Sequence, residues 1–229
     1  MHDGQNLFDS STSFSGVDWG VHRALGRLAW QDGVRDAIIV GIWNTHERIP
    51  EYMPERPMRE FAPDGIRERF EETYGGFPKS DAYLGMIVDE LKPFIDGRYR
   101  TRGGREDTFI MGSSMGGLVS LYALCEYPDV FVGAGCLSTS WTIAGKLVLA
   151  YLQKRLPRAG IHRLYFDYGA EAQVARYESL QKTVDRMVVK AGYRRGQNWM
   201  TGRFPGASHS EAAWRDRVDV PLRFLLGTR

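Results

Sequence analysis

The 229-residue sequence has few cysteines, little net charge and no long apolar run, and each shortage excludes a class of protein. Its two cysteines, Cys125 and Cys136, are too few for a disulfide framework, and they lie in apolar segments. We therefore expect both to be small core residues, and we expect a reducing, cytoplasmic compartment. The 30 basic and 28 acidic side chains are scattered and leave a net charge of +2, so nothing electrostatic points to nucleic acid.

Long apolar stretches and metal-ligand patterns are missing from the sequence as well. The longest apolar runs, such as residues 37–43, have the length of a strand and fall far below the ~20 residues that cross a bilayer. We expect a soluble protein without a membrane partner. The sequence contains no H-E-x-x-H pattern and no internal repeat, so we expect chemistry that uses neither a metal nor another cofactor.

Strand-like and helix-like segments alternate along the chain, which predicts a single α/β domain, residues 1–229, around a mostly parallel sheet. Between residues 44 and 80 the periodicity disappears while prolines and charges gather, which indicates a long loop or small cap at the rim of a pocket. The expected strands are 37–43, 108–111, 130–137, 163–168 and 198–204, and the expected helices are 17–30, 81–96, 118–125, 174–191 and 211–226, the last interrupted by Pro221.

The most informative segment is GSSMGG at residues 112–117, which places Ser114 at the centre of a G-x-S-x-G pattern between a strand and a helix. A serine on such a sharp turn has a strained backbone, and near-absent side chains at Gly112 and Gly116 let the two elements pass each other. The pattern predicts Ser114 as a catalytic nucleophile. A glycine-rich turn whose serine caps the helix is the alternative.

A serine nucleophile needs a histidine to take its proton and an acid to orient that histidine. In hydrolases with this turn the chain order is serine, acid, histidine, and His209 lies in the fitting place, between the last strand and the last helix. For the acid we prefer Glu171, on the loop after strand 163–168, to Asp167, which lies inside that strand. The alternative is that Glu171 is not catalytic and is a carboxylate at a helix start, where the dipole of the following helix stabilises its charge.

Acyl transfer also needs N–H donors aimed at the developing oxyanion. One donor should be the backbone N–H of Met115, directly after the nucleophile. The second should come from the opening segment HDGQNLFD at residues 2–9, where we prefer Gln5 to Gly4. The alternative is that this segment supplies no oxyanion donor and is a mobile terminus that contains turn residues.

Three aromatic residues, Trp43, Tyr52 and Trp141, lie on predicted loops that should ring the pocket. Aromatic platforms suit aryl or sugar-bearing esters, and they suit plain packing equally well. Arg48 and Glu51 in the same region are interpreted as an ion pair that fixes the loop.

Four segments together, HDGQNLFD, GSSMGG, YFDYG and PGASHSEAAW, resemble the "putative esterase" family of α/β hydrolases over nearly the whole chain. That family includes feruloyl, acetyl xylan and siderophore esterases, S-formylglutathione hydrolase and mycolyltransferases. The resemblance implies a three-layer α/β-hydrolase sandwich and a serine carboxylic ester hydrolase with a Ser-acid-His triad and a covalent acyl-enzyme. Several relatives have an Asp three residues after the strand-end glycine, where this chain has Ala172.

The resemblance also suggests the substrate, which would be a small-molecule or carbohydrate-linked ester. Two other functions stay open: a non-catalytic binding module on a hydrolase scaffold, and an acyltransferase of the mycolyltransferase type. Whether the chain forms a homo-oligomer is open too.

The opening segment departs from the family pattern, in which the HDGQNLFD motif follows a strand that is itself preceded by two or more strands. Here the motif begins at His2, so we expect a sheet that lacks its first strands and exposes an apolar edge. We therefore expect one of three things: a protein of low stability, a partner that covers the exposed edge, or a true start of the protein that lies upstream.

Overall fold

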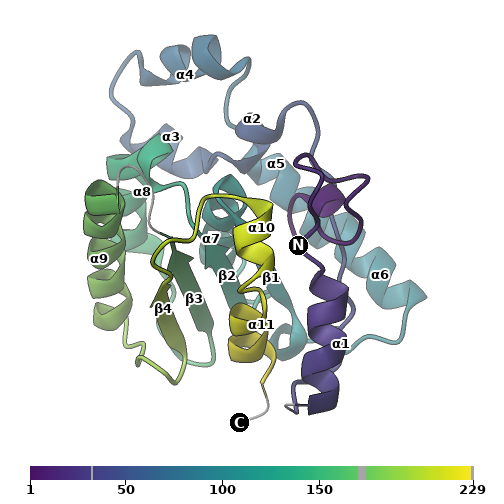
Figure 1. Ribbon diagram of the computed structural model, residues 1–229. Coiled ribbons are helices and arrows are strands. Elements are labelled where there is room, and N and C mark those ends of the chain that lie inside the picture. Colours follow the sequence, from purple (N-terminus) through teal and green to yellow (C-terminus); the bar gives the residue numbers. More distant parts are fainter. Residues whose placement is uncertain (32, 170–173, 228–229) are drawn as a thin grey trace.

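The computed structural model of the chain describes residues 1–31, 33–169 and 174–227. Its sheet has four strands, all parallel, in the spatial order β1-β2-β3-β4. The strands are β1 (Phe109–Ser113), β2 (Gly133–Leu137), β3 (Arg163–Tyr168) and β4 (Trp199–Arg203). A helix lies in each connection between successive strands, so the fold is α/β, as the sequence predicts (Figure 1). Because the strands are parallel, all their carboxyl ends lie at one edge of the sheet.

The helices fall into three groups along the chain. Before the sheet come α1 (Val21–Gln31), α2 (Arg48–Tyr52), α3 (Glu55–Phe61), α4 (Ile66–Tyr74), α5 (Ser80–Gly85) and α6 (Lys92–Arg98). Between the strands come α7 (Met115–Glu126), α8 (Trp141–Arg155) and α9 (Val174–Lys190). After the sheet come α10 (Glu211–Arg215) and α11 (Asp219–Leu226). Short 3-10 turns lie at Gly4–Asn6 (η1) and Arg105–Asp107 (η3), and a π-helical turn, η2 (Met86–Leu91), joins α5 to α6.

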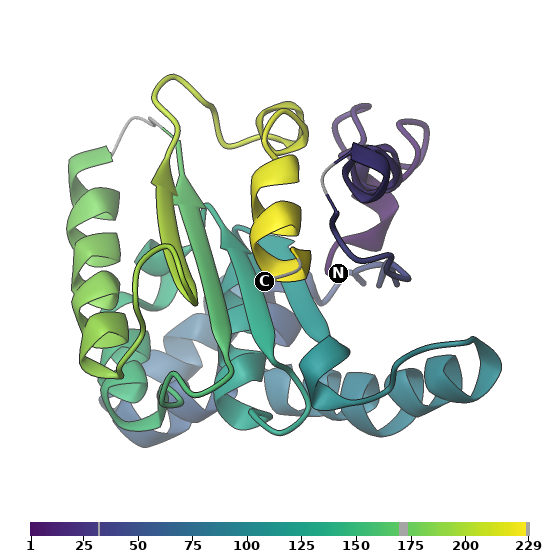
Figure 2. The same cartoon turned by 90° about the horizontal axis from the view of Figure 1, so that it is seen from below.

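Helices cover both faces of the sheet, so apolar side chains of neighbouring strand positions are buried on opposite faces rather than alternating with solvent-facing ones. Cys136 and Phe166 belong to the core shared with α7, α8 and α9, whereas Leu137 and Tyr165 face the core shared with α1 and α11. In Figure 2 the yellow α11 and the dark-blue α1 lie on one side of the sheet and the teal helices on the other. The two faces together hold the carboxyl edge of the sheet in place.

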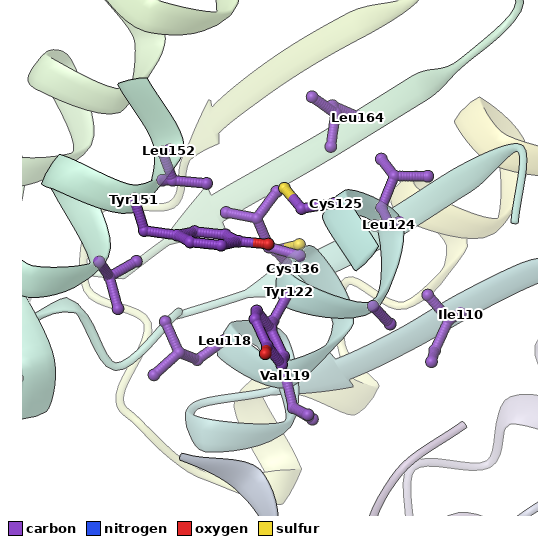
Figure 3. Packing of buried hydrophobic residues seen from close by; sticks show 14 of the residues in the cluster. Ile110, Leu118, Val119, Tyr122, Leu124, Cys125, Cys136, Tyr151, Leu152 and Leu164 are labelled. Atoms are coloured by element: carbon purple, nitrogen blue, oxygen red, sulfur yellow. The ribbon is translucent and has the colours of Figure 1, made fainter. Parts of the chain in front are cut away.

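Both cysteines are free and buried, as predicted. Figure 3 shows Cys125 and Cys136 in one apolar cluster with Tyr122 and Tyr151. Burial raises the pKa of both thiols, because the thiolate would lose its hydration there. Neither thiol is therefore poised for nucleophilic chemistry.

The predicted strand at 37–43 is wrong: the structure assigns no strand to residues 35–45 of the described chain. This segment is extended, and its residues 40–42 pair with the opening residues, through the Met1 N to Val40 O (2.7 Å), Ile42 N to Met1 O (2.9 Å) and Gly4 N to Ile42 O (2.7 Å) hydrogen bonds. His2 N donates to Met111 O of β1 at 3.0 Å, so residues 1–4 lie between β1 and residues 40–42. Ile38 lies outside this short run of hydrogen bonds, and it is 51% exposed.

The predicted loop or small cap at residues 44–80 contains helices α2, α3 and α4, which lie above the sheet in Figure 1. Two other expectations need correction. Helix α8, which the sequence analysis missed, follows β2 directly. The predicted helix 211–226 is two helices, and the break comes before Pro221, which lies in the first turn of α11, where a missing N–H costs little.

Candidate active site

Ser114 lies on the sharp turn between β1 and α7, with φ of 57° and ψ of −120°. Only three non-glycine residues in the described part of the chain have positive φ, and the other two are Asp3 and Ser138. Such strain persists only where the surroundings enforce it, and it is concentrated at functional sites. Ser114 N donates to Leu137 O at 2.8 Å, which fixes the turn against the end of β2.

The two glycines of the pattern provide the space that the turn needs. A Cβ on Gly112 would lie 2.8 Å from the carbonyl carbon of Gly116, and a Cβ on Gly116 would lie 3.2 Å from Cβ of His2. The strand, the helix and the opening segment therefore meet at a point where only backbone fits. This is the steric reason for the spacing that the sequence shows.

Gly112→Ala is expected to lower the free energy of unfolding by about 1–3 kcal/mol. Its Cβ would clash with backbone atoms of Gly116, which cannot move aside by a change of rotamer as a side chain can. Urea denaturation measures the change. The matched control is Gly97→Ala in α6, where a Cβ meets nothing within 4 Å and helix propensity favours alanine. Equal stability of Gly112→Ala and wild type would contradict the steric argument.

The hydroxyl of Ser114 contacts a second serine. Ser114 Oγ lies 2.8 Å from Ser140 Oγ, and Ser140 N donates to Ser114 O at 3.0 Å. Met115 follows as the first residue of α7, where a backbone N–H has no intrahelical acceptor. The N–H of Met115 and the hydroxyl of Ser114 are thus held by the same turn.

The opening segment lies against the start of α7. The Cβ position of Gly116 is 3.4 Å from Asp3 Oδ2, so the predicted second oxyanion donor comes from a segment that borders the turn. Of the two predicted donors, Gly4 already donates its N–H to Ile42 O at 2.7 Å. This favours Gln5, whose side-chain Oε1 accepts from Asn44 N at 3.3 Å.

Asp3, rather than Glu51, is the ion-pair partner of Arg48, so the predicted Arg48–Glu51 pair is corrected. Arg48 donates from Nε to Asp3 Oδ1 at 2.6 Å and from Nη2 to Asp3 Oδ2 at 2.8 Å. Asn44 Nδ2 also donates to Asp3 Oδ1, and the Tyr52 hydroxyl accepts from Asp3 N at 3.1 Å. The pair still fixes a loop, as predicted, but it fixes the opening segment to α2.

Arg48→Met is expected to lower the free energy of unfolding by about 1–3 kcal/mol, because it leaves the buried carboxylate of Asp3 without its main donor. Thermal and urea denaturation measure this. Arg59→Met is the matched control, since Arg59 pairs with Glu55 at only 3.4 Å on the exposed face of α3, and its loss should cost less than about 1 kcal/mol. The same loss for both variants would argue against a special role of the Asp3 pair.

His209 lies on the loop between β4 and α10, exposed, and directly before Ser210, which caps α10 by accepting from Ala213 N at 3.4 Å. Its ring meets the indole of Trp214 edge-on, with centroids 5.0 Å apart and planes at 76°. The next residue but one, Glu211, accepts from Asn6 Nδ2 at 3.4 Å. The histidine loop therefore borders the opening segment, which in turn borders the Ser114 turn.

The two predicted acids differ in what the structure says of them. Glu171 lies outside the described residues. Asp167 is fully buried in β3, where Arg217, Tyr165 and the N–H of Ser138 donate to its carboxylate. Burial raises the pKa of this carboxyl, and the charge of Arg217 acts in the opposite direction. With these donors in place, Asp167 is committed to a structural contact.

The three predicted pocket residues lie in different environments. Tyr52 and Trp141 are buried, and the Trp141 indole donates to Gln181 Oε1 on α9 at 2.9 Å. Trp43 is 62% exposed. Tyr52 and Trp141 therefore lie in the core of the protein, and their contact with a substrate stays a prediction.

Other kinds of site find no support in the part of the chain that the structure describes. No group of three or more His, Cys, Asp or Glu side chains there could hold a metal ion. No helix among these residues is long and apolar enough to span a bilayer.

Comparisons with known proteins identify the family. The sequence profile of the family described as "Putative esterase" matches residues 1–225. The chain belongs to this family. The chain is also 26% identical over 133 residues to the uncharacterized protein YbbA of Bacillus subtilis (strain 168), an alignment that covers 55% of this chain and 51% of YbbA. The chain thus spans about half the length of the curated relative that it matches.

Solved structures show the same fold. An IroE-like serine hydrolase from Shewanella oneidensis superposes on this chain with a TM-score of 0.73 at 22% identity, covering 98% of this chain and 68% of that one. The enterobactin esterase FES from Shigella flexneri superposes with a TM-score of 0.69 at 18% identity, covering 98% of this chain and 51% of FES. The chain therefore has the α/β fold of these esterase structures.

Sequence reasoning missed two residues of the candidate site, Ser140 and Arg217. Ser140 carried a signal that was available, because it follows a strand that neighbours the strand before Ser114, and parallel strands end at the same edge. Arg217 carried none, because nothing in a local pattern shows that an arginine after α10 meets a carboxylate in β3.

Proposed function

We propose that this esterase is a serine carboxylic ester hydrolase that forms a covalent acyl-enzyme on Ser114. The observation that carries the proposal is the backbone of Ser114, held at φ 57° between β1 and α7, where it presents a hydroxyl next to the free N–H groups expected at a helix start. The family and the fold support the same reaction class.

In the proposed first step, His209 takes the proton of Ser114 while Oγ attacks the ester carbonyl carbon. The carbonyl oxygen becomes an oxyanion, to which the N–H groups of Met115 and Gln5 donate. His209 then gives its proton to the leaving alcohol, and the C–O bond to that alcohol breaks. In the second step water, deprotonated by His209, releases the acid and restores Ser114. Glu171 is proposed to orient His209.

A serine-directed fluorophosphonate tests the nucleophile directly. We expect one label per chain, on the peptide that contains Ser114, together with hydrolysis of p-nitrophenyl acetate. Folded protein that hydrolyses no ester and takes up no label would instead support a non-catalytic binding module. Label on a different serine would overturn the assignment of Ser114.

The acid is tested by comparing Glu171→Ala with Asp167→Ala. Loss of the acid of a triad lowers kcat by more than about 100-fold while the protein stays folded. We expect this result for Glu171→Ala. Asp167→Ala should lower stability, because it leaves the buried guanidinium of Arg217 without its carboxylate. The reverse pattern would transfer the role to Asp167.

The substrate class is tested with a panel of catecholate, feruloyl, acetyl-sugar and short-chain esters. We propose that catecholate esters give the highest kcat/KM, because the fold is shared with an enterobactin esterase. Addition of sugar or alcohol acceptors, followed by product analysis, distinguishes hydrolysis from acyl transfer.

A further inference from the structure

A buried ion pair lies beneath the loop that carries His209. The side chains of Arg217 and Asp167 are 4% and 0% exposed. Arg217 donates from Nε to Asp167 Oδ2 and from Nη2 to Asp167 Oδ1, both at 3.1 Å. The Tyr165 hydroxyl donates to Oδ2 at 3.0 Å and Ser138 N donates to Oδ1 at 3.2 Å, so both carboxylate oxygens have two donors.

The same guanidinium connects the ion pair to the histidine loop. Arg217 donates from Nη1 to Ala213 O of α10 at 2.9 Å and from Nη2 to Ser138 Oγ at 2.9 Å. Ser138 Oγ also accepts from Trp214 Nε1 at 3.2 Å. Since the Trp214 indole is the ring that meets His209 edge-on, an unbroken series of contacts leads from β3 to the imidazole.

A second branch leads from the ion pair toward the nucleophile. Ser138 has a φ of 42°, a strained conformation that its contacts with Asp167 and Arg217 hold in place. Two residues later, Ser140 places its hydroxyl 2.8 Å from Ser114 Oγ. The ion pair thus borders both halves of the proposed catalytic pair.

Stability alone is a poor explanation for such a pair. Removing two charges from water is costly, and replacing a buried ion pair by apolar residues of similar volume is often neutral or stabilising by about 1–4 kcal/mol. What an apolar pair cannot do is donate hydrogen bonds to Ser138 Oγ and Ala213 O. The geometry that those bonds impose is therefore the property that only the ion pair provides.

We propose that Arg217 and Asp167 are positioning residues that fix Trp214 and Ser138, and through them set the placement of His209 relative to Ser114. The inference rests on the proposed function, in which His209 is the general base. Neither residue touches substrate. Both act by holding the residues that do.

The decisive variant is the double substitution Asp167→Leu/Arg217→Met, which fills the space without leaving a single buried charge. We expect it to stay folded, because the neutral hydroxyl of Tyr165 and N–H of Ser138 that lose their acceptor cost less than a single unpaired buried charge. We expect kcat for p-nitrophenyl acetate to fall by about 10- to 100-fold with KM within about twofold, because small displacements of catalytic groups act on the chemical step. The rate of fluorophosphonate labelling at Ser114 should fall in parallel.

Arg217→Lys is the second variant, and it remains informative if the double variant does not fold. Lysine keeps the charge, but its compact ammonium cannot reach Asp167, Ser138 and Ala213 together as the guanidinium fork does. We expect a folded protein with kcat lowered about 10-fold. Wild-type kcat in Arg217→Lys would overturn the inference.

The matched control is Arg27→Met/Asp219→Leu, which removes an ion pair between α1 and the first turn of α11. Arg27 donates to Asp219 at 2.6 Å, but the side chains are 49% and 31% exposed, so this pair is far less buried than Arg217 and Asp167. We expect wild-type kcat for this control. A fall equal to that of the double variant would show that any disturbance of α11 suffices, and would overturn the inference.

A readout independent of activity comes from NMR of His209, assigned with a His209→Asn variant. The Trp214 ring lies close enough to shift the imidazole Cε1–H resonance, and in the double variant this resonance should move toward its random-coil value. An unmoved resonance together with wild-type kcat would overturn the inference. If wild type itself shows no esterase activity and no label on Ser114, the proposed function fails, and the resonance alone then decides whether the ion pair positions His209.

Discussion

Ser114→Ala is expected to lower kcat for p-nitrophenyl esters by about 10⁴-fold or more while leaving the fold intact. Alanine tolerates the φ of 57° no better than serine, and it keeps the contact of Ser114 N with Leu137 O, so the turn itself should be unchanged. What disappears is the only protein atom in the proposal that bonds to the acyl carbon. The residual rate would come from the oxyanion donors and binding alone.

Initial rates, the pre-steady-state burst and fluorophosphonate uptake should all be lost together in this variant. Circular dichroism and urea denaturation check that the protein is folded. The matched control is Ser179→Ala, which removes an exposed hydroxyl on α9 that has no part in the proposed mechanism, and it should retain wild-type kcat. Activity of Ser114→Ala above about 1% of wild type would contradict a covalent mechanism on this residue.

The sequence was sufficient to locate the turn because its constraint is local. Glycine at 112 and 116 leaves a signature that needs no long-range information, and the structure has the strand, the strained serine and the helix where the signature puts them. The predicted strands at 163–168 and 198–204 were found as β3 and β4, because each is a short segment with β-prone aromatic residues between turns and helices. These elements give the order of strands and hence the edge on which the site lies.

Predictions that depended on side-chain direction were harder to make. Trp141 looked like a loop aromatic, yet it begins α8 and its indole N–H is held by Gln181, 40 residues away in the sequence. Arg48 was matched with its near neighbour Glu51, whereas its partner in space is Asp3. In both cases the partner is set by tertiary packing, which a local pattern does not encode.

The extended segment at 37–43 illustrates a different limit. Its composition is that of a buried parallel strand, but a strand also needs neighbours along its length, and only residues 1–4 provide them. Trp43 and Ile38 are consequently exposed. Composition can indicate what a segment is suited to form, while the hydrogen-bond partners decide whether it forms.

His209→Ala is the other variant with a large expected effect, a fall in kcat of about 10⁴-fold or more. Without the imidazole, Ser114 keeps its proton, and a neutral serine hydroxyl is a weak nucleophile. The loss should be larger for an alkyl ester than for a p-nitrophenyl ester, because an alkoxide leaving group needs the proton that His209 carries and p-nitrophenolate does not. The ratio of the two losses therefore reports general-acid catalysis separately from general-base catalysis.

His46→Ala, which removes an exposed imidazole just before α2, is the matched control and should leave kcat unchanged. Because the His209 side chain is exposed, free imidazole can enter the space that His209→Ala leaves, and millimolar imidazole should restore part of the activity in a saturable way. Rescue by imidazole in His209→Ala but not in Ser114→Ala would assign the base and the nucleophile separately. Activity of His209→Ala that stays within about 10-fold of wild type would show that another group takes the proton, and it would remove His209 from the mechanism even if Ser114 were labelled.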